Sequence, residues 1–389
     1  MTGSTPPGAK LAIMTMLHSF APGGVERVAL RLCGAWAQHA HVDVQLVMGR
    51  ETGAMIAEAP AHLVRHTTPE PFPTASWESL WLLWILPRHI RRLRPDVIFA
   101  AGNTYAIIAV VMKLWLGRRC PPVVLKISND LARADMNPLL RRGYHCWLRI
   151  QGRLVDHATG LAAPMRAEVA QFLALPDDRI HIVDDPALSA ADHAGLAAIG
   201  AARTPSAGHG RHYVGVGRLA RQKNWPLLVT AFARIAGRDD RLTIIGEGAE
   251  RARISATATA LGVADRLDMP GHGAAASALA AADVYVLSSD FEGVPAVVIE
   301  ALASGLPVVA TDCSVSIASL VGGFGTVVAV GDATALAAAM AAQTPLSPEQ
   351  RSAAAAEMAR FTVERAAEAY LALFRMAADA QHHTRFRSS

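Results

Sequence analysis

Two glutamates with seven residues between them stand in the segment 288–305, SSDFEGVPAVVIEALASG. Glu292 precedes a turn. Glu300 lies in an alanine-rich run, predicted to form a helix that starts near the proline of this segment, because proline fits the first helical turn. The N–H groups of Gly293, Val294 and the first turn then lack intrahelical partners and can face an anion. The carboxylates can accept hydrogen bonds from hydroxyls of a sugar or a ribose. The segment therefore predicts a site for a ligand that carries an anion and hydroxyl groups.

A second loop supplies fixed positive charge. Gly217, Arg218 and Lys223 lie in GRLARQKN, between a predicted strand over 212–216 and a predicted helix. The loop also imitates a dinucleotide fingerprint, with the spacing G-x-G-x-x-A, which would indicate a nicotinamide enzyme. Cations inside the loop and the late start of the helix favour a departing diphosphate over that cofactor, since fixed cations pair strongly with phosphate oxygens.

A third candidate is the pair Gly23 and Gly24. These residues follow a continuous apolar run over 10–17, typical of a strand buried in a parallel sheet, and precede an amphipathic helix predicted over 25–38. Strand, glycine loop and helix form the opening of a βαβ unit, where ligands bind at the carboxyl end of the strand. We expect the glycines to let a ligand approach the backbone, and an ordinary turn into the helix is the alternative.

The bulk composition limits the classes that remain. At 389 residues the chain is long enough for two domains, and 52% hydrophobic against 18% charged residues excludes a disordered protein. The four cysteines show no C-x-x-C spacing, so we expect reduced thiols and no metal or redox pair. A net charge of +4 favours anionic partners without choosing among a nucleotide, a lipid headgroup and a nucleic acid. The most apolar run, 105–117, is too short to cross a bilayer, and the first ten residues lack a signal-peptide pattern.

The segment around Glu292 and Glu300 resembles the E-x7-E element of the retaining GT-B glycosyltransferases of the family 4 type, also called glycosyl transferases group 1. Further segments resemble the C-terminal half of that family in the same order, namely 215–235, 242–254, 281–289 and 305–312. The resemblance implies an α/β fold with two Rossmann-like parallel-sheet domains facing each other across a cleft. On this basis we expect an N-terminal acceptor-binding domain over 1–190, a linker over 191–211 and a C-terminal nucleotide-sugar-binding domain over 212–362. A helix over 363–377 is expected to cross back to the N-terminal domain, and a tail to follow over 378–389.

The resemblance also implies roles for these residues. Arg218 and Lys223 would neutralise charge on the departing diphosphate, Glu300 would hold the ribose hydroxyls, and Glu292 would hold the transferred sugar. The expected catalytic residues are Arg218, Lys223 and Glu292. The expected donor-binding residues are Gly23, Gly24, Gly217, Arg218, Lys223, Glu292, Gly293, Val294 and Glu300. In the family these roles need no metal, and the nucleotide-diphosphate sugar is a substrate, so no cofactor is expected.

The chain departs from the family at three places. Asn129 follows a predicted strand over 123–128, where the family commonly has a histidine near the transfer centre. Asparagine is no base but can hydrogen-bond a hydroxyl, so we expect Asn129 on the acceptor side. Ala163-Pro164 and Asp185-Pro186 replace a serine and an Asn-Pro pair of the family, so no contact is carried over to these positions.

Two segments combine aromatic and basic residues. One spans 76–95, with Trp77, Trp81 and Trp84 followed by Arg88, His89, Arg91, Arg92 and Arg94, and the other spans 137–155. Such segments suit the headgroup boundary of an anionic membrane, or alternatively a helix that packs between domains and ends in a solvated basic patch. We expect a cytoplasmic protein, either free or peripheral on the cytoplasmic face of a membrane.

The predicted function is retaining transfer of a sugar from a nucleotide-diphosphate donor to a glycan or a polyprenyl- or lipid-linked acceptor, in the synthesis of a bacterial-type surface polysaccharide or glycolipid. No nucleic-acid partner is expected. Two alternatives stay open: a GT-B protein that binds a nucleotide sugar or a lipid without catalysis, and a GT-B nucleotide-sugar epimerase. Donor turnover by the wild type and by Glu292→Ala would discriminate among them.

Overall fold

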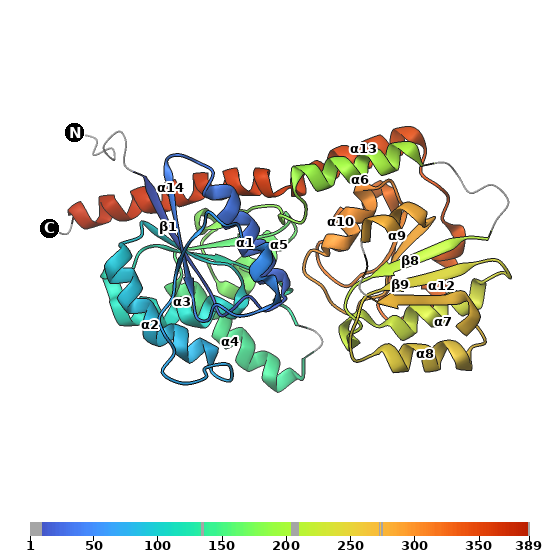
Figure 1. Ribbon diagram of the computed structural model, residues 1–389, viewed down its shortest axis with the longest axis horizontal. Helices are drawn as coiled ribbons and strands as arrows, with labels where there is room; N and C mark the ends of the chain where they lie inside the picture. Colours follow the sequence, from blue (N-terminus) through green and yellow to red (C-terminus); the bar gives the residue numbers. More distant parts are fainter. Residues whose placement is uncertain (1–9, 134–135, 204–209, 272, 274, 388–389) are drawn as a thin grey trace. The chain divides into compact units, whose positions relative to one another are not determined.

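The computed structural model describes residues 10–133, 136–203, 210–271, 273 and 275–387. The chain divides into two compact units, an N-terminal unit of residues 1–186 with 363–389, and a C-terminal unit of residues 187–362. Each unit has one parallel sheet with helices on both faces, which confirms the predicted pair of Rossmann-like domains (Figure 1).

The sheet of the N-terminal unit has seven parallel strands in the order β3-β2-β1-β4-β5-β6-β7. Their bounds are Leu11–Leu17 (β1), Val42–Met48 (β2), Val64–His66 (β3), Val97–Ala100 (β4), Val123–Lys126 (β5), His157–Gly160 (β6) and Ile180–Ile182 (β7). The strand order reverses between β1 and β4, where Ile13 pairs with Val97. In such sheets, ligands bind beyond the carboxyl ends of the strands at this reversal.

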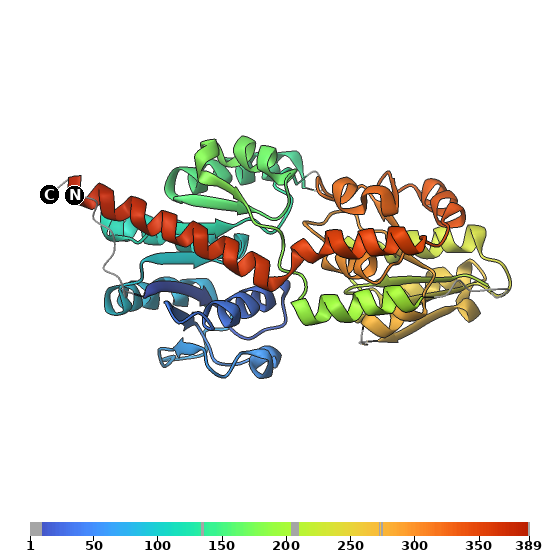
Figure 2. The ribbon, with the colours of Figure 1, turned by 90° about the horizontal axis from the view of Figure 1, so that it is seen from above.

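The helices of the N-terminal unit cover the two faces of this sheet unequally. Their bounds are Gly24–Trp36 (α1), Glu78–Leu93 (α2), Ala106–Leu116 (α3), Pro138–Leu154 (α4), Met165–Leu173 (α5) and Val363–Arg387 (α14). On one face α14 packs beside α1, whereas α2, α3 and α4 follow one another along the other face (Figures 1 and 2).

Helix α14 packs onto the rest of the N-terminal unit through a cluster of aromatic side chains. Trp36 of α1 makes edge contacts with Phe99 of β4 at 5.3 Å and with Phe374 of α14 at 5.1 Å between ring centroids. Tyr370 also belongs to the cluster, with its hydroxyl 3.0 Å from Thr159 Oγ1. Trp36 Nε1 donates a hydrogen bond to the carbonyl of Ala367 (3.1 Å). These rings are buried, so the helix completes the core of this unit.

The sheet of the C-terminal unit has six parallel strands in the order β10-β9-β8-β11-β12-β13. Their bounds are His212–Val216 (β8), Arg241–Ile245 (β9), Leu267–Gly271 (β10), Val284–Leu287 (β11), Val308–Thr311 (β12) and Gly325–Val328 (β13). The order again reverses once, between β8 and β11, where Tyr285 pairs with Val214. The carboxyl ends of these two strands therefore mark the expected ligand edge of this sheet.

The helices of the C-terminal unit form a layer on each face of the sheet. Their bounds are Ala190–Ala202 (α6), Trp225–Ile235 (α7), Arg251–Ala260 (α8), Ala275–Ala281 (α9), Ala296–Ala303 (α10), Ile317–Val321 (α11), Ala333–Ala342 (α12) and Pro348–Met358 (α13). Helix α7 packs against both α8 and α12, and α6 and α13 lie side by side near α10 (Figures 1 and 2). Alternate residues of β11 enter opposite cores, with Tyr285 on the α10 side and Val286 on the α7 side.

The structure corrects two expectations and bears on a third. The linker predicted over 191–211 is largely helix α6, because Ser189 and Asp192 form a capping box and alanine favours the helix. Helix α14 continues to Arg387, through most of the tail predicted over 378–389. In the segment considered either for a membrane-facing surface or for a packing helix, Trp81 and His89 are buried, as the second alternative expects, and Trp81 Nε1 donates to the carbonyl of Gly49 (3.0 Å).

Candidate functional site

The loops that follow β8 and β11 are joined at the point where the strand order of the C-terminal sheet reverses. The N–H of Asp290 donates to the carbonyl of Gln222 (2.8 Å), and Gln222 Nε2 donates to the carbonyl of Phe291 (2.8 Å). Asn224 Nδ2 donates to Asp290 Oδ1 (2.7 Å). These bonds hold the cation-bearing loop against the loop that carries Glu292.

Lys223 and Glu292 form an ion pair at the centre of this junction. Lys223 Nζ lies 2.6 Å from Glu292 Oε1, and the two side chains are only 14% and 12% exposed. Ser289 Oγ donates to the same carboxylate oxygen (2.8 Å). Burial, followed by the charge of Glu292, raises the pKa of the nearby Cys313 to about 12, so this thiol stays neutral beside the pair. Partial burial strengthens the attraction compared with a solvated pair.

Gly217 gives Lys223 the space for this contact. Its φ of +155° is rarely adopted by residues with a side chain, and a Cβ there would lie 2.9 Å from Lys223 Cε. The neighbouring Arg218 is exposed, and its side chain makes no hydrogen bond or ion pair with the described residues. The structure thus brings Gly217, Lys223 and Glu292 into contact and leaves the guanidinium of Arg218 available to a ligand.

Two further glycines support this loop, and the sequence analysis assigned neither of them to the site. A Cβ on Gly246 would lie 2.0 Å from the carbonyl oxygen of Gly217, and a Cβ on Gly248 would lie 2.4 Å from that of Leu219. Both glycines have φ above +150°. The signal in the sequence was Gly-Glu-Gly directly after β9, because adjacent parallel strands place their following loops at one edge.

The turn before α10 presents backbone amides as expected. Helix α10 begins at Ala296, with Pro295 as the N-cap residue. The N–H groups of Gly293 and Val294 donate no hydrogen bond within the described part of the chain. These amides and those of the first helical turn can therefore bind an anion, which the positive end of the helix dipole also favours.

Glu300 and Glu292 share a neighbour beneath α10. Tyr285 of β11 is fully buried, and burial followed by the charges of Glu292 and Glu300 raises its pKa well above its usual value. Both carboxylates therefore lie near one phenol, although one belongs to a loop and the other to a helix. Glu300 is half-buried. The two glutamates are thus placed on the same side of the sheet as α10, at its ligand edge.

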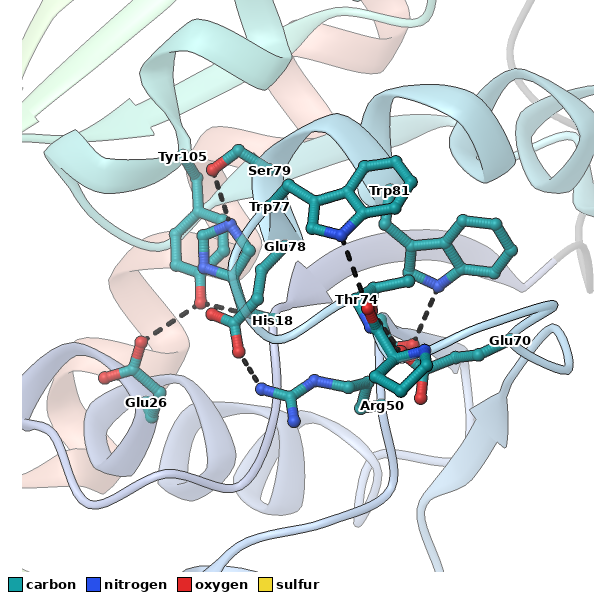
Figure 3. A network of polar contacts seen from close by, with 12 residues as sticks. His18, Glu26, Arg50, Glu70, Thr74, Trp77, Glu78, Ser79, Trp81 and Tyr105 are labelled. Atoms are coloured by element: carbon teal, nitrogen blue, oxygen red, sulfur yellow. Dashed lines mark hydrogen bonds and ion pairs between the residues drawn. The ribbon is translucent and has the colours of Figure 1, made fainter.

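In the N-terminal unit, the strand order also reverses between β1 and β4. His18 follows β1, Tyr105 follows β4, and the two side chains contact each other at this point (Figure 3). Their rings stack at 4.8 Å, and Tyr105 Oη lies 3.3 Å from the backbone nitrogen of His18. Tyr105 donates to Glu26 Oε1 (3.1 Å), and His18 Nε2 lies 3.1 Å from Ser79 Oγ. Burial, followed by the charge of Arg50, lowers the pKa of His18 to about 4. A neutral imidazole, a phenol and a carboxylate therefore meet at this edge, a group that the sequence analysis missed.

The two glycines after β1, Gly23 and Gly24, differ in the space around their Cα atoms. A Cβ on Gly23 would lie 2.1 Å from Glu26 Oε2, so the carboxylate of Glu26 fills the space over Gly23. Nothing among the described residues lies within 4 Å of a Cβ built on Gly24. Gly23 therefore accommodates Glu26, whereas Gly24 leaves open space at the first position of α1.

Asn129 lies in a loop that Glu168 of α5 holds in place. Asn129 is exposed, whereas Glu168 is buried and accepts hydrogen bonds from the N–H groups of Leu131 (2.6 Å) and Ala132 (2.9 Å). Burial, then the hydrogen bond and the charge of Asp130, raises the pKa of Glu168 to about 8. Glu168 is therefore protonated at neutral pH and fixes the loop next to the residue that stands where the family has a histidine.

Two searches of the described residues gave no result. No three or more His, Cys, Asp and Glu side chains converge there in a way that would hold a metal ion. No helix within the described ranges is both long and apolar enough to cross a bilayer.

Comparison with known proteins agrees with this architecture. The family model described as "Glycosyltransferase Family 4" matches residues 22–185, and the one described as "Glycosyl transferases group 1" matches residues 210–343. The chain is 38% identical over 97 residues to the lipopolysaccharide core biosynthesis glycosyltransferase LpsE of Rhizobium meliloti, covering 25% of this chain and 28% of that protein. It is 30% identical over 274 residues to a GDP-mannose-dependent alpha-mannosyltransferase of Mycobacterium tuberculosis, covering 67% of this chain and 65% of that protein.

Solved structures share the fold at low sequence identity. A glycosyltransferase from Rickettsia africae has a TM-score of 0.73 at 12% identity, covering 95% of this chain and 98% of that one. Anabaena Alr3699/HepE, solved with UDP and glucose, has a TM-score of 0.71 at 17% identity, covering 93% and 99%.

The alignments span less than two thirds of the length of LpsE and of the mannosyltransferase. The two family matches nevertheless cover more than half of the chain between them, one over β2 to β7 of the N-terminal sheet and the other over β8 to β13 of the C-terminal sheet. On these grounds the chain belongs to the GT-B glycosyltransferases of the group 1 and family 4 type.

Proposed function

We propose that the protein transfers a sugar, with retention of its anomeric configuration, from a nucleotide-diphosphate donor to a glycan or lipid-linked acceptor. The observation that carries the proposal is the contact between Lys223 and Glu292 at the reversal of the C-terminal sheet. A cation and a carboxylate are held there between two loops, beside free amides of Gly293 and Val294. This set of groups is complementary to a diphosphate joined to a sugar.

Each group has a distinct task in this reaction. Breaking the bond between the sugar and the diphosphate builds negative charge on the departing phosphate oxygen. Lys223, the exposed Arg218 and the amides before α10 stabilise this charge because they are fixed in place before the reaction. Glu292 accepts hydrogen bonds from the transferred sugar, and Glu300 accepts them from the ribose. The charge is met by the protein's own groups, so the proposed reaction uses no metal ion.

The acceptor side is proposed for the N-terminal unit, at the reversal between β1 and β4. His18, Tyr105 and Glu26 form a hydrogen-bonded cluster there, in which His18 and Tyr105 are buried, and the exposed Asn129 lies on the loop after the adjacent strand β5. The low pKa of His18 keeps its ring neutral at physiological pH, so one ring nitrogen can accept a hydrogen bond. Like Asn129, this neutral imidazole would contribute hydrogen bonding and not proton abstraction.

Related proteins guide the choice of donor and acceptor. HepE was solved with UDP and glucose, and the M. tuberculosis relative is named as GDP-mannose-dependent. LpsE and WaaB, a structural neighbour with a TM-score of 0.68, are named for lipopolysaccharide core synthesis. We therefore propose a UDP- or GDP-sugar as donor and a bacterial surface glycolipid as the class of acceptor.

The first experiment is a thermal-shift panel of UDP-, GDP- and ADP-sugars, because a ligand that binds only the folded state raises the melting temperature. Turnover of the stabilising donor is then measured for the wild type and for Glu292→Ala. The proposal expects release of the nucleotide by the wild type and its loss in the variant. Stabilisation without turnover, with and without added glycolipid acceptors, would favour the second candidate, a nucleotide-sugar-binding protein without catalysis. That candidate is motivated by Asn129 at the position of the family's histidine.

A further inference from the structure

A groove of about 590 Å³ lies at the amino-terminal edge of the N-terminal sheet. Pro95 and Asp96 in its wall directly precede β4, and Pro121 shortly precedes β5. The remaining wall comes from the ends of α2 and α3 and from α14, through Ile90, Arg91, Arg94, Trp115, Leu116, Arg119 and Gln381. The groove is therefore at the opposite edge of the sheet from His18 and Tyr105, which follow β1 and β4.

Three arginines line this groove without an ion pair to any described residue. Arg91, Arg94 and Arg119 are exposed, and none of their side chains makes a hydrogen bond or an ion pair with the described residues. Asp96 is the single acid among the groove's lining residues, and its Oδ2 already accepts a hydrogen bond from the N–H of Ala12 (2.8 Å). The lining groups thus leave an excess of positive charge that can bind an anion.

The backbone of Arg94 is consistent with a role for this side chain. Arg94 is the C-cap residue of α2 and has φ +48°, ψ +55°, in the left-handed region where glycine is the usual residue. A side chain in this conformation has an energetic cost that glycine does not have. An arginine here places a guanidinium at the groove in spite of that cost.

Three exposed apolar side chains on the two helices that end at the groove are referred to below as the rim residues, and one of them, Trp115, lines the groove itself. Trp84 of α2 is 73% exposed, and Leu114 and Trp115 of α3 are 65% and 56% exposed. Trp84, Arg88 and Arg91 are spaced four and three residues apart, so one exposed stripe of α2 runs from tryptophan to arginine. Helices α2 and α3 lie side by side (Figure 1), and Trp115 of α3 lines the same groove as the three arginines.

We propose that this groove binds the phosphate headgroup of an anionic membrane lipid, while the rim residues enter the boundary between headgroups and acyl chains. The arginines supply the charge complementary to a phosphate. Exposed tryptophan and leucine beside them suit an amphiphile, since tryptophan favours the membrane interface and a soluble phosphate would leave these side chains in water. The site is independent of the donor site in the C-terminal unit.

The test is flotation of the full chain with vesicles of phosphatidylglycerol mixed with phosphatidylcholine, compared with vesicles of phosphatidylcholine alone, at low salt. The wild type is expected to float with the mixed vesicles. The triple variant Arg91→Gln, Arg94→Gly, Arg119→Gln is expected to bind them about a hundredfold more weakly, from roughly fivefold for each basic residue at a membrane surface. A second variant, Leu114→Ser with Trp115→Ser, is expected to weaken binding while keeping all three arginines.

The matched control replaces three exposed arginines of α4, Arg142, Arg149 and Arg153, with glutamine. It removes the same charge from the same unit, so it is expected to bind as the wild type does. An equal loss in the control would show diffuse attraction and overturn the groove as a site. Failure of the wild type to float, or binding of inorganic phosphate alone in a thermal-shift assay, would overturn the lipid assignment. Donor stabilisation of each variant, measured in parallel, separates a failure here from a failure of the proposed transferase.

Discussion

The ammonium of Lys223 lies 2.6 Å from the carboxylate of Glu292, so the cation proposed to face the donor diphosphate is already partly neutralised when the site is empty. A nucleoside diphosphate must therefore share Lys223 with Glu292. The carboxylate can stay close because it also has the hydroxyl of Ser289 as a partner, 2.8 Å away. This arrangement makes separable predictions for the nucleotide and for the sugar.

Glu292→Gln is expected to tighten binding of the free nucleoside diphosphate by about tenfold, because it removes a negative charge worth on the order of 1–2 kcal/mol near the phosphates. The intact nucleotide sugar should gain less, since the variant loses a charged acceptor for the sugar hydroxyls. Calorimetric titration with both ligands measures the difference. Equal changes for both ligands would contradict the placement of Glu292 beside the sugar.

Lys223→Ala is expected to lower kcat about 10²–10³-fold, the usual effect of removing one preorganised group that stabilises developing charge. Lys223→Arg should retain part of the activity, because a guanidinium can still pair with phosphate oxygens. The measurement is steady-state transfer with the donor found in the thermal-shift panel. A variant with unchanged kcat would remove Lys223 from the reaction.

Glu300→Gln is expected to raise KM for the donor about tenfold with little change in kcat. The ribose does not change during transfer, and a hydrogen bond to a charged group contributes about 1.5–3 kcal/mol to ground state and transition state alike. Initial rates over a range of donor concentrations separate the two constants. If kcat fell and KM stayed constant, Glu300 would belong with the departing group.

Gly246→Ala is expected to lower the free energy of unfolding of the C-terminal unit by about 2–4 kcal/mol, from an unfavourable backbone conformation and a forced contact. Its φ is +151°, and the added Cβ would lie 2.0 Å from the carbonyl of Gly217. Gly323→Ala is the control, because Gly323 has no positive φ and nothing described lies within 4 Å of its Cβ position. Urea denaturation of both variants gives the comparison.

Glu168→Gln tests the buried acid that holds the loop of Asn129. The pKa of Glu168 rises from 4.5 to about 8 on folding. A raised pKa means that its contribution is fully present below pH 4.5 and is lost as the pH rises through about 8, because only the unfolded state ionises in that window. The difference in unfolding free energy, wild type minus variant, should therefore fall between about pH 5 and pH 8. A difference independent of pH would contradict a protonated Glu168.

The sequence was sufficient for elements with strong local signals. The apolar run of β8 and the Gly-Arg-Leu-Ala loop after it predicted both the strand and the cation-bearing turn. Helix α6 was predicted as a linker because its alanine-rich sequence has no apolar period, although Ser189 and Asp192 form a capping box at its start. Local patterns were therefore informative where spacing alone determines structure.

Contacts between segments that are distant in the sequence could not be predicted from it. His18 and Tyr105 are 87 residues apart, and their stacking depends on β1 lying next to β4. The buried pair of Lys126 and Asp185, 3.3 Å apart, likewise depends on the position of β5. Asp185 departs from the family's asparagine, and its partner becomes evident only once the sheet is assembled. Side-chain pairing across a sheet needs the strand order, which no single segment contains.

The attachment of α14 to the N-terminal unit has a consequence for biosynthesis. Trp36 and Phe99 pack against Tyr370 and Phe374, yet a ribosome makes those two partners only after the whole of residues 187–362. The N-terminal unit therefore exposes part of its hydrophobic core to solvent until α14 has been synthesised. The C-terminal unit, in contrast, has all of its residues once Thr362 has left the ribosome. During synthesis from the N-terminus, the C-terminal unit can therefore finish folding before the N-terminal unit does.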